Sequence, residues 1–190
     1  MSHHPIFNVF PVINLAEVTL RELSSNDAKN FLAYISDPLV HKYLSDDDFP
    51  KTIESAKEEM SYWARLFYLK HSIYWGIADN STGNLIGTCG FNNWSKTHSR
   101  VEISYDLDHN FWGNGIMTKS LGAIIKLAME KMDVNRVQAT VAHDNFSSIK
   151  LLDRLGFERE GLLRHYGILH DEKTNFYMYG LVKNTKESSE

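Results

Sequence analysis

The chain has 190 residues, 43% of them hydrophobic and 23% charged, a balance typical of one globular domain with a sizeable core. Its formal net charge of −4 and the lack of a lysine and arginine cluster argue against nucleic acid as the main ligand. No apolar run approaches the roughly 20 residues that span a membrane, and no Cys/His spacing suits zinc, so we expect neither membrane insertion nor a metal.

The N-terminal part predicts a strand and two helices. Residues 1–11 lack the pattern of a secretion signal, which favours a cytoplasmic protein. A strand is expected over 18–23 and a helix over 28–35, which Asp37-Pro38 ends before a short helical turn through Tyr43. A longer helix from about residue 52 follows from apolar residues at helical spacing: Ile53, Ala56, Met60, Trp63 and Phe67.

The middle of the chain predicts three consecutive strands, over 73–78, 85–91 and 101–107. Cys89, the single cysteine, lies in the second of them and is expected to be a buried structural thiol. The third strand alternates, with Val101, Ile103, Tyr105 and Leu107 on one side and Glu102, Ser104 and Asp106 on the other.

The C-terminal part predicts a helix over 115–132, a strand over 136–142 and a short helix over 145–155. Two further strands, 157–169 and 175–182, are expected to form a closing hairpin around residues 170–173. This order predicts an α+β fold with a central mixed, mostly antiparallel sheet that contains one parallel β-α-β step and is flanked by helices. We expect one domain over 1–183 and a disordered tail over 184–190.

A glycine-containing loop joins the third of the central strands to the helix that follows it. Its residues are Trp112, Gly113, Asn114, Gly115, Ile116 and Met117. Glycine permits close approach of a ligand, and a helix N-terminus carries partial positive charge, so the loop suits a pyrophosphate. Gly-x-Gly also occurs in ordinary turns, and both a Walker loop and a Gly-x-Gly-x-x-Gly dinucleotide motif are absent.

A second motif, Asn145-x-x-Ser148, opens a helix that ends in Leu155-Gly156-Phe157. Together the two motifs resemble the acetyl-CoA loop and following helix of GNAT N-acetyltransferases. The strand that contains Glu102 and the Trp-Gly-x-Gly loop are similar to the subgroup that includes ribosomal-protein-alanine N-acetyltransferases. The resemblance covers nearly the whole chain and implies a GNAT-like fold, acetyl-CoA as acyl donor and an amine acceptor.

The resemblance also implies where acetyl-CoA binds. The pyrophosphate would lie on the backbone amides of the glycine loop, and the pantetheine arm would pair like a strand with Tyr105, Asp106 and Leu107. Trp112 and Met117 depart from the general family pattern, and Met117 is expected to crowd the pyrophosphate slightly. Asn145 would hold a cofactor amide or a water, or serve only as the helix cap.

Attack of an amine on a thioester requires a base, because alkyl amines are mostly protonated at neutral pH. The resemblance makes Glu102 the candidate base, and the alternative is an exposed strand carboxylate. Many family members carry a tyrosine at the position of Leu152, so Ser148 becomes the candidate acid for the leaving thiolate, and the alternative is an ordinary first-turn residue.

The acceptor is open to several classes: a protein N-terminus, a polyamine, an amino sugar, an amino acid or an antibiotic. Asp46, Asp47 and Asp48 form either a solvated loop or an acidic rim of the acceptor site. A homodimer is expected through an exposed edge of the final hairpin: Phe176, Tyr177 and Tyr179. The competing functions are a non-catalytic acyl-CoA-binding or sensing protein and a nucleotide-phosphate-binding protein.

Overall fold

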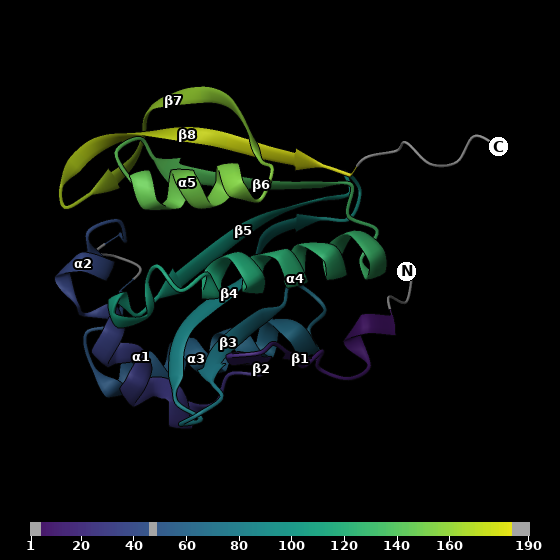
Figure 1. Cartoon of the computed structure of the whole chain (residues 1–190), viewed down its shortest axis with the longest axis vertical. Helices are drawn as coiled ribbons and strands as arrows, with labels where there is room; N and C mark the ends of the chain where they lie inside the picture. Colours follow the sequence, from purple (N-terminus) through teal and green to yellow (C-terminus); the bar gives the residue numbers. More distant parts are fainter. Residues whose placement is uncertain (1–4, 46–48, 184–190) are drawn as a thin grey trace.

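A mixed sheet of eight strands organises the computed structural model, which describes residues 5–45 and 49–183 (Figure 1). The strands lie in the order β1-β2-β3-β4-β5-β6-β8-β7, and β5 and β6 are the parallel pair. Their bounds are β1 Ile13–Asn14, β2 Val18–Arg21, β3 Tyr74–Asp79, β4 Leu85–Ser95, β5 Arg100–Leu107, β6 Arg136–Ala142, β7 Glu158–Leu169 and β8 Glu172–Val182. This confirms the predicted α+β fold with a mixed, mostly antiparallel sheet.

Helices cover both faces of the sheet, with α4 and α5 on the face nearer the viewer in Figure 1 and α1 and α3 behind it. Their bounds are α1 Ala28–Ile35, α2 Pro38–His41, α3 Ile53–Tyr68, α4 Ile116–Lys131 and α5 Phe146–Arg154. Short 3-10 helices cover Pro5–Phe7 (η1), Ser25–Asp27 (η2) and His109–Phe111 (η4). None of these helices is long and apolar enough to span a membrane, within the described ranges.

Apolar residues of α4, the helix predicted over 115–132, form the centre of the larger core. Leu121, Ile124 and Ala128 are fully buried against strand residues that include Val101 and Val137. Burying several large aliphatic side chains at about 1.5–3 kcal/mol each is what fastens this helix to the sheet. Cys89 is fully buried in the same core, as expected for a structural thiol.

A second core lies under α1 and α3. Phe31 and Met60 are buried there, and the half-buried Trp63 stacks on Tyr74 with ring centroids 5.1 Å apart. Ser55 and Thr52 bond each other's backbone N–H groups and so cap α3, which explains why the helix begins where the predicted pattern begins.

The hairpin differs from the prediction. β8 begins at Glu172, so the turn contains only His170 and Asp171, both with positive φ (50° and 63°). β8 lies between β6 and β7, so Phe176, Tyr177 and Tyr179 are on an interior strand, and the expectation that they form an exposed edge is wrong. The edge strand of the hairpin is β7.

Candidate functional site

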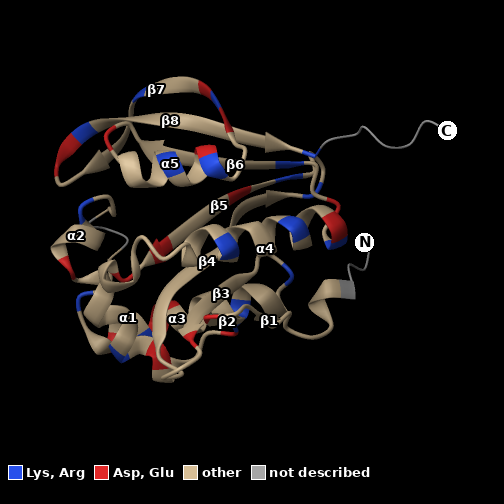
Figure 2. Ribbon diagram, in the orientation of Figure 1, with Lys and Arg blue, Asp and Glu red and all other residues tan. Residues whose placement is uncertain are grey.

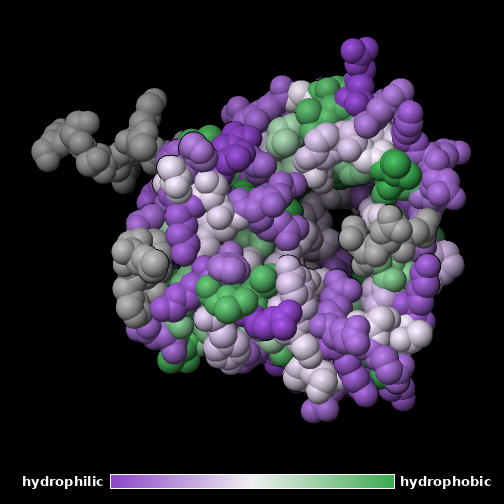
Figure 3. Space-filling model, turned by 180° about the vertical axis from the view of Figure 1, so that it is seen from behind, coloured by the Kyte–Doolittle hydropathy of each residue, from purple (hydrophilic) through white to green (hydrophobic). Residues whose placement is uncertain are grey.

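The two parallel strands separate after a short stretch of pairing. On β5 the residues with partners on β6 are Arg100, Val101 and Glu102, which pair with Arg136, Val137 and Gln138. Beyond them, residues 103–107 of β5 and 139–142 of β6 diverge, and we call this opening the fork. The surface seen from behind is hollowed at the same level, between the part formed by β6, β7 and β8 and the rest of the molecule (Figure 3).

The backbone of Tyr105 points into the fork. Backbone groups alternate sides along a strand, and the N–H of Asp108 donates to the carbonyl of Ile86 at 2.8 Å on the β4 side. The N–H groups of Asp106 and Asp108 therefore face β4, and that of Tyr105 faces the other way. Leu107 also faces the fork, but its carbonyl accepts the indole N–H of Trp112 at 2.8 Å. Of the three strand residues predicted to pair with the pantetheine arm, Tyr105 presents its backbone there.

The Asp106 side chain has a structural role on the opposite face. Its carboxylate accepts hydrogen bonds from the Tyr34 hydroxyl at 2.5 Å, the Thr88 hydroxyl at 2.7 Å and the Thr88 N–H at 3.0 Å. Burial raises the pKa of Asp106, and burial together with this carboxylate holds the pKa of Tyr34 well above its usual range. The network connects α1 to β4 and β5. Because the backbone N–H of Asp106 faces β4 and not the fork, the structure does not support the prediction that Asp106 binds the cofactor.

Glu102 lies where the fork begins. It is half-buried, and its carboxylate accepts hydrogen bonds from Thr140 Oγ1 at 3.0 Å, Asn93 Nδ2 at 3.2 Å and Gln138 Nε2 at 3.4 Å. Donors on both neighbouring strands hold the carboxylate in one orientation. An exposed strand carboxylate, the alternative considered above, would lack this set of partners.

Tyr105 and Ser148 meet on the other face of the sheet. The Tyr105 Oη lies 2.5 Å from Ser148 Oγ, so a hydroxyl from β5 bonds one from the first turn of α5. Burial raises the pKa of Tyr105 to about 12. Asn145 accepts the N–H of Ser148 on its side-chain oxygen at 3.1 Å, which establishes it as the N-cap of α5. The partnership of Tyr105 and Ser148 was not predicted, because the two residues are separated by 43 positions in sequence.

The glycine loop is open at the positions where a phosphate would approach. Gly113 and Gly115 have φ of 79° and 74°, and a Cβ added to either would meet no atom within 4 Å. Gly115 is the N-cap of α4, so the first N–H groups of that 16-residue helix have no intrahelical partner. Asn114 Nδ2 donates to the Phe111 carbonyl at 3.3 Å, and Trp112 anchors the loop to β5.

Ile116 and Met117 differ from the rest of the loop because their side chains point inward. Both are buried in the larger core. The expectation that Met117 crowds a pyrophosphate is therefore wrong, because its side chain is buried in the core. Lys119, one turn into α4, forms an ion pair with Glu17 at 2.7 Å. Figure 2 shows lysine and arginine interspersed with acidic residues over the ribbon rather than gathered at the loop.

The segment after α2 bridges the open end of the fork. The Tyr43 hydroxyl donates to the Asp144 carbonyl at 3.0 Å, and a hydrogen bond of 3.2 Å joins His170 Nε2 to the Lys42 carbonyl. These bonds connect the α1 side of the molecule to the loop before α5 and to the tip of the β7–β8 hairpin. Asp46, Asp47 and Asp48, predicted to border the acceptor site, lie outside the described residues, as does the predicted tail.

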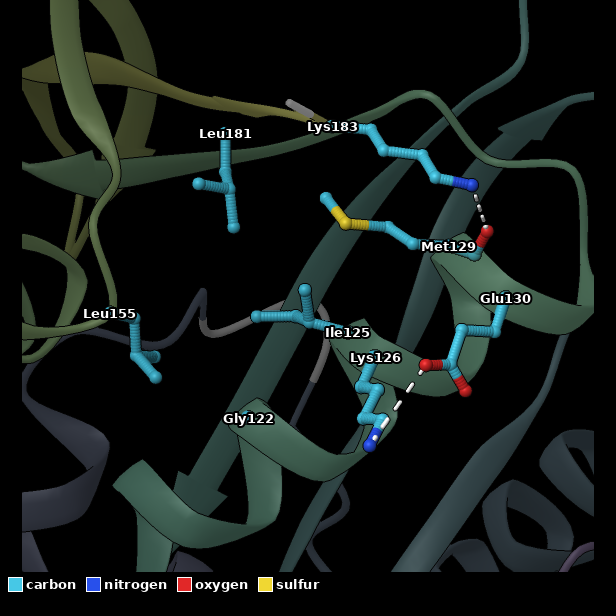
Figure 4. A pocket seen from close by; sticks show the side chains of 8 residues that line it. All are labelled: Gly122, Ile125, Lys126, Met129, Glu130, Leu155, Leu181 and Lys183. Atoms are coloured by element: carbon cyan, nitrogen blue, oxygen red, sulfur yellow. Dashed lines mark hydrogen bonds and ion pairs between the residues drawn. The ribbon is translucent and has the colours of Figure 1, made fainter. Parts of the chain in front are cut away.

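A separate groove of about 390 Å³ lies at the other end of α4, where β5 and β6 are paired (Figure 4). Its lining is largely apolar, with Ile125, Met129, Leu155 and Leu181, and its lysines are engaged: Lys183 Nζ donates to the Met129 carbonyl at 3.0 Å, and Lys126 lies 3.9 Å from Glu130. None of the predicted site residues lines it. Within the described ranges no cluster of histidine, cysteine and acidic side chains is arranged to hold a metal ion.

Comparison with known proteins shows which family the chain resembles. A model of the acetyltransferase (GNAT) domain matches residues 17–158. The uncharacterised N-acetyltransferase p20 of Bacillus licheniformis is 34% identical over 166 residues, which cover 87% of this chain and 93% of that protein. The ribosomal protein uS5-alanine N-acetyltransferase of Escherichia coli (strain K12) is 29% identical over 140 residues, covering 67% of this chain and 72% of that protein.

A solved structure is similar in fold. It is a ribosomal L7/L12 alpha-N-protein acetyltransferase in complex with coenzyme A, with a TM-score of 0.83, 19% identity and coverage of 90% of this chain and 98% of that chain. The region matched by the family model contains the fork, the glycine loop and the helix that begins after Asn145.

Proposed function

Because the chain belongs to the GNAT acetyltransferase family, we propose that it transfers an acetyl group from acetyl-CoA to a primary amine by direct attack in a ternary complex. The observation that carries this proposal is that β5, the strand that borders the fork, bears the carboxylate of Glu102 and the backbone of Tyr105 and leads into the glycine loop. Each supplies one requirement of thioester aminolysis.

The loop and the fork supply the binding surface for the acyl donor. First-turn N–H groups of α4 and the open space at Gly113 and Gly115 fit a pyrophosphate, and the backbone of Tyr105 fits an amide-containing arm. The acetyl thioester is the activated group that acetyl-CoA brings. A backbone N–H at the fork, that of Tyr105, would donate to the carbonyl oxygen as negative charge develops on it.

Glu102 supplies the base. The incoming amine must lose a proton before or during attack, and a carboxylate oriented by three donors can accept it directly or through a water. Its side chain projects from the face opposite to the Tyr105 side chain, so the carboxylate and the Tyr105 hydroxyl lie on different faces of the sheet, with the fork between β5 and β6 open to both. Glu102 shares its face of the sheet with Asp106, which bonds Tyr34 of α1, so an acceptor that enters on the α1 side would lie on the same face as the carboxylate.

The proposed acceptor is a protein N-terminus. Support comes from the names of the relatives, which include a ribosomal protein uS5-alanine N-acetyltransferase and a ribosomal L7/L12 alpha-N-protein acetyltransferase. A small-molecule amine is the second candidate, and a homodimer is part of the proposal.

The experiment is a thiol-release assay of the full chain with acetyl-CoA and a panel of amines: a short peptide that begins with alanine, spermidine, glucosamine and free amino acids. We expect thiol release and a product heavier by one acetyl group with the peptide. A thermal shift with acetyl-CoA but no thiol release with any amine would instead support the non-catalytic acyl-CoA-binding alternative. A shift with ATP or NAD and none with acetyl-CoA would support nucleotide binding.

A further inference from the structure

The paired hydroxyls of Tyr105 and Ser148 contain one more O–H donor than the hydrogen bond between them uses. Two hydroxyl groups bring two O–H protons, and the 2.5 Å bond between them uses one. No other hydroxyl partner of either residue is found in the part of the chain that the structure describes. One O–H group of the pair is therefore left to donate outward, beside the fork.

The pair also spans the two sides of the fork. Tyr105 belongs to β5, and Ser148 belongs to the helix that follows β6, so the bond closes across the gap where the strands have separated. Both side chains are half-buried, which keeps the pair accessible to a ligand in the fork. Leu152, one turn later on α5, is fully buried, and its aliphatic side chain has no hydroxyl to donate.

The chemistry of the proposed reaction, on which this inference rests, creates a demand for that proton. When the C–N bond has formed and the C–S bond breaks, the bonding electron pair goes to sulfur. A thiolate released into a partly buried site lacks the water that would stabilise its charge. A proton donor at the fork would convert it to a thiol as it leaves.

We propose that Tyr105 is the catalytic acid of this enzyme, that its phenolic proton is transferred to the departing sulfur, and that Ser148 is a positioning residue that holds the phenol oxygen. The phenolate left behind accepts the hydrogen bond of Ser148 and is reprotonated from water, so protons balance over a turnover. Of the two hydroxyls the phenol is the more acidic, which makes it the donor. Its pKa of about 12 means that it stays protonated at neutral pH.

The test compares two acyl donors in the same protein. Acetyl-CoA releases a thiolate, and acetyl-seleno-CoA releases a selenolate, which is a much weaker base and needs no proton to leave. Tyr105→Phe should lower turnover with acetyl-CoA by roughly 10²-fold, the lower end of general acid catalysis. With the selenoester most of that loss should disappear. Because the ratio of the two rates is taken within one variant, a change in its stability does not affect the result.

Two further variants complete the design. Ser148→Ala should lose less than Tyr105→Phe, and the double variant should be no slower than Tyr105→Phe alone, because residues that act as a unit are not additive. Tyr62→Phe, an exposed tyrosine on α3, is the matched control and should retain wild-type rates with both donors.

The outcomes separate this inference from the proposed function. An active wild type with an unimpaired Tyr105→Phe variant, or a variant equally slow with both donors, would overturn the role of Tyr105 alone. A wild type that releases no thiol with any acceptor would overturn the proposed acetyl transfer and this inference with it.

Discussion

Glu102 differs from an ordinary strand carboxylate because three side chains direct hydrogen bonds at it. If it removes the amine proton, Glu102→Gln should lower turnover by roughly 10²–10⁴ with unchanged affinity for acetyl-CoA. The loss should shrink as pH rises, because a larger fraction of the acceptor then arrives neutral. A pH–rate profile with the alanine peptide measures this.

The control for this prediction is Glu58→Gln. It makes the same carboxylate-to-amide change at an exposed residue of α3 and should leave the pH–rate profile unchanged. Melting temperatures of both variants exclude a folding defect. Wild-type turnover of Glu102→Gln at every pH would eliminate Glu102 as the base and leave a proton transfer to solvent.

Gly115 offers a test of the phosphate site that separates charge from strain. Its φ of 74° disfavours most side chains, but aspartate and asparagine tolerate the left-handed region and have the same shape. A negative charge at the N-terminus of α4 stabilises the helix, so Gly115→Asp should melt at or above Gly115→Asn. The same charge repels a pyrophosphate. Gly115→Asp should therefore bind acetyl-CoA at least roughly tenfold more weakly than Gly115→Asn, a difference of about 1.4 kcal/mol in binding free energy.

Calorimetric titration and thermal melts in low salt provide both numbers. Opposite signs for stability and affinity are the expected signature of an anion site. Equal affinities in the two variants would show that the pyrophosphate lies elsewhere.

At the scale of elements, the first turn of α5 depends on Asn145. Its side-chain bond to the Ser148 N–H caps the helix, so Asn145→Ala should lower the free energy of unfolding by about 1 kcal/mol, and Asn145→Asp should keep most of it. Because the cap also places Ser148, turnover should fall with the alanine variant and be retained with aspartate. Loss of turnover in both, with stability retained in Asn145→Asp, would indicate that the amide itself contacts a ligand.

The elements with strong local signals were predicted closely. The predicted bounds of α1 and β6 agree with the structure. Hydrogen bonds between Ser24 and Asp27 fix the 3-10 turn before the helix, Pro38 follows it, and β-branched residues define the strand. β1, two residues long, was missed since so short a segment has no periodicity. The hairpin turn was placed too wide because His170 and Asp171 adopt positive φ without a glycine to mark it.

The candidate site was predictable as a set of residues but not as a geometry. The family resemblance pointed to the glycine loop, Glu102 and Ser148, and their roles in the reaction stay predictions. Which hydroxyl meets Ser148, and which strand flanks β8, depend on pairings between distant segments that no local pattern specifies. Alternation along β5 did indicate that Tyr105 and Glu102 project from opposite faces.

For the whole molecule, the exposed side of β7 is the surface that we expect between subunits. Leu162, Tyr166 and Ile168 are large apolar residues with 49%, 58% and 62% of their surface exposed. Two register shifts interrupt this edge strand, and such bulges oppose continuous strand pairing. Light scattering should give a dimer mass, and Ile168→Lys should reduce it to a monomer. A wild-type monomer at working concentration would remove dimerisation from the proposal.

The short stretch of pairing between β5 and β6 has a consequence for how the molecule opens. It joins two antiparallel blocks, β1 to β5 and β6 to β8, each held by hydrogen bonds between strands that do not depend on the other block. We expect their amide hydrogens to exchange as two units of local unfolding, with α4 as the covalent link. A ligand that contacts both blocks would hold them together. Binding in the fork should therefore slow amide hydrogen exchange in strands of either block that do not contact the ligand.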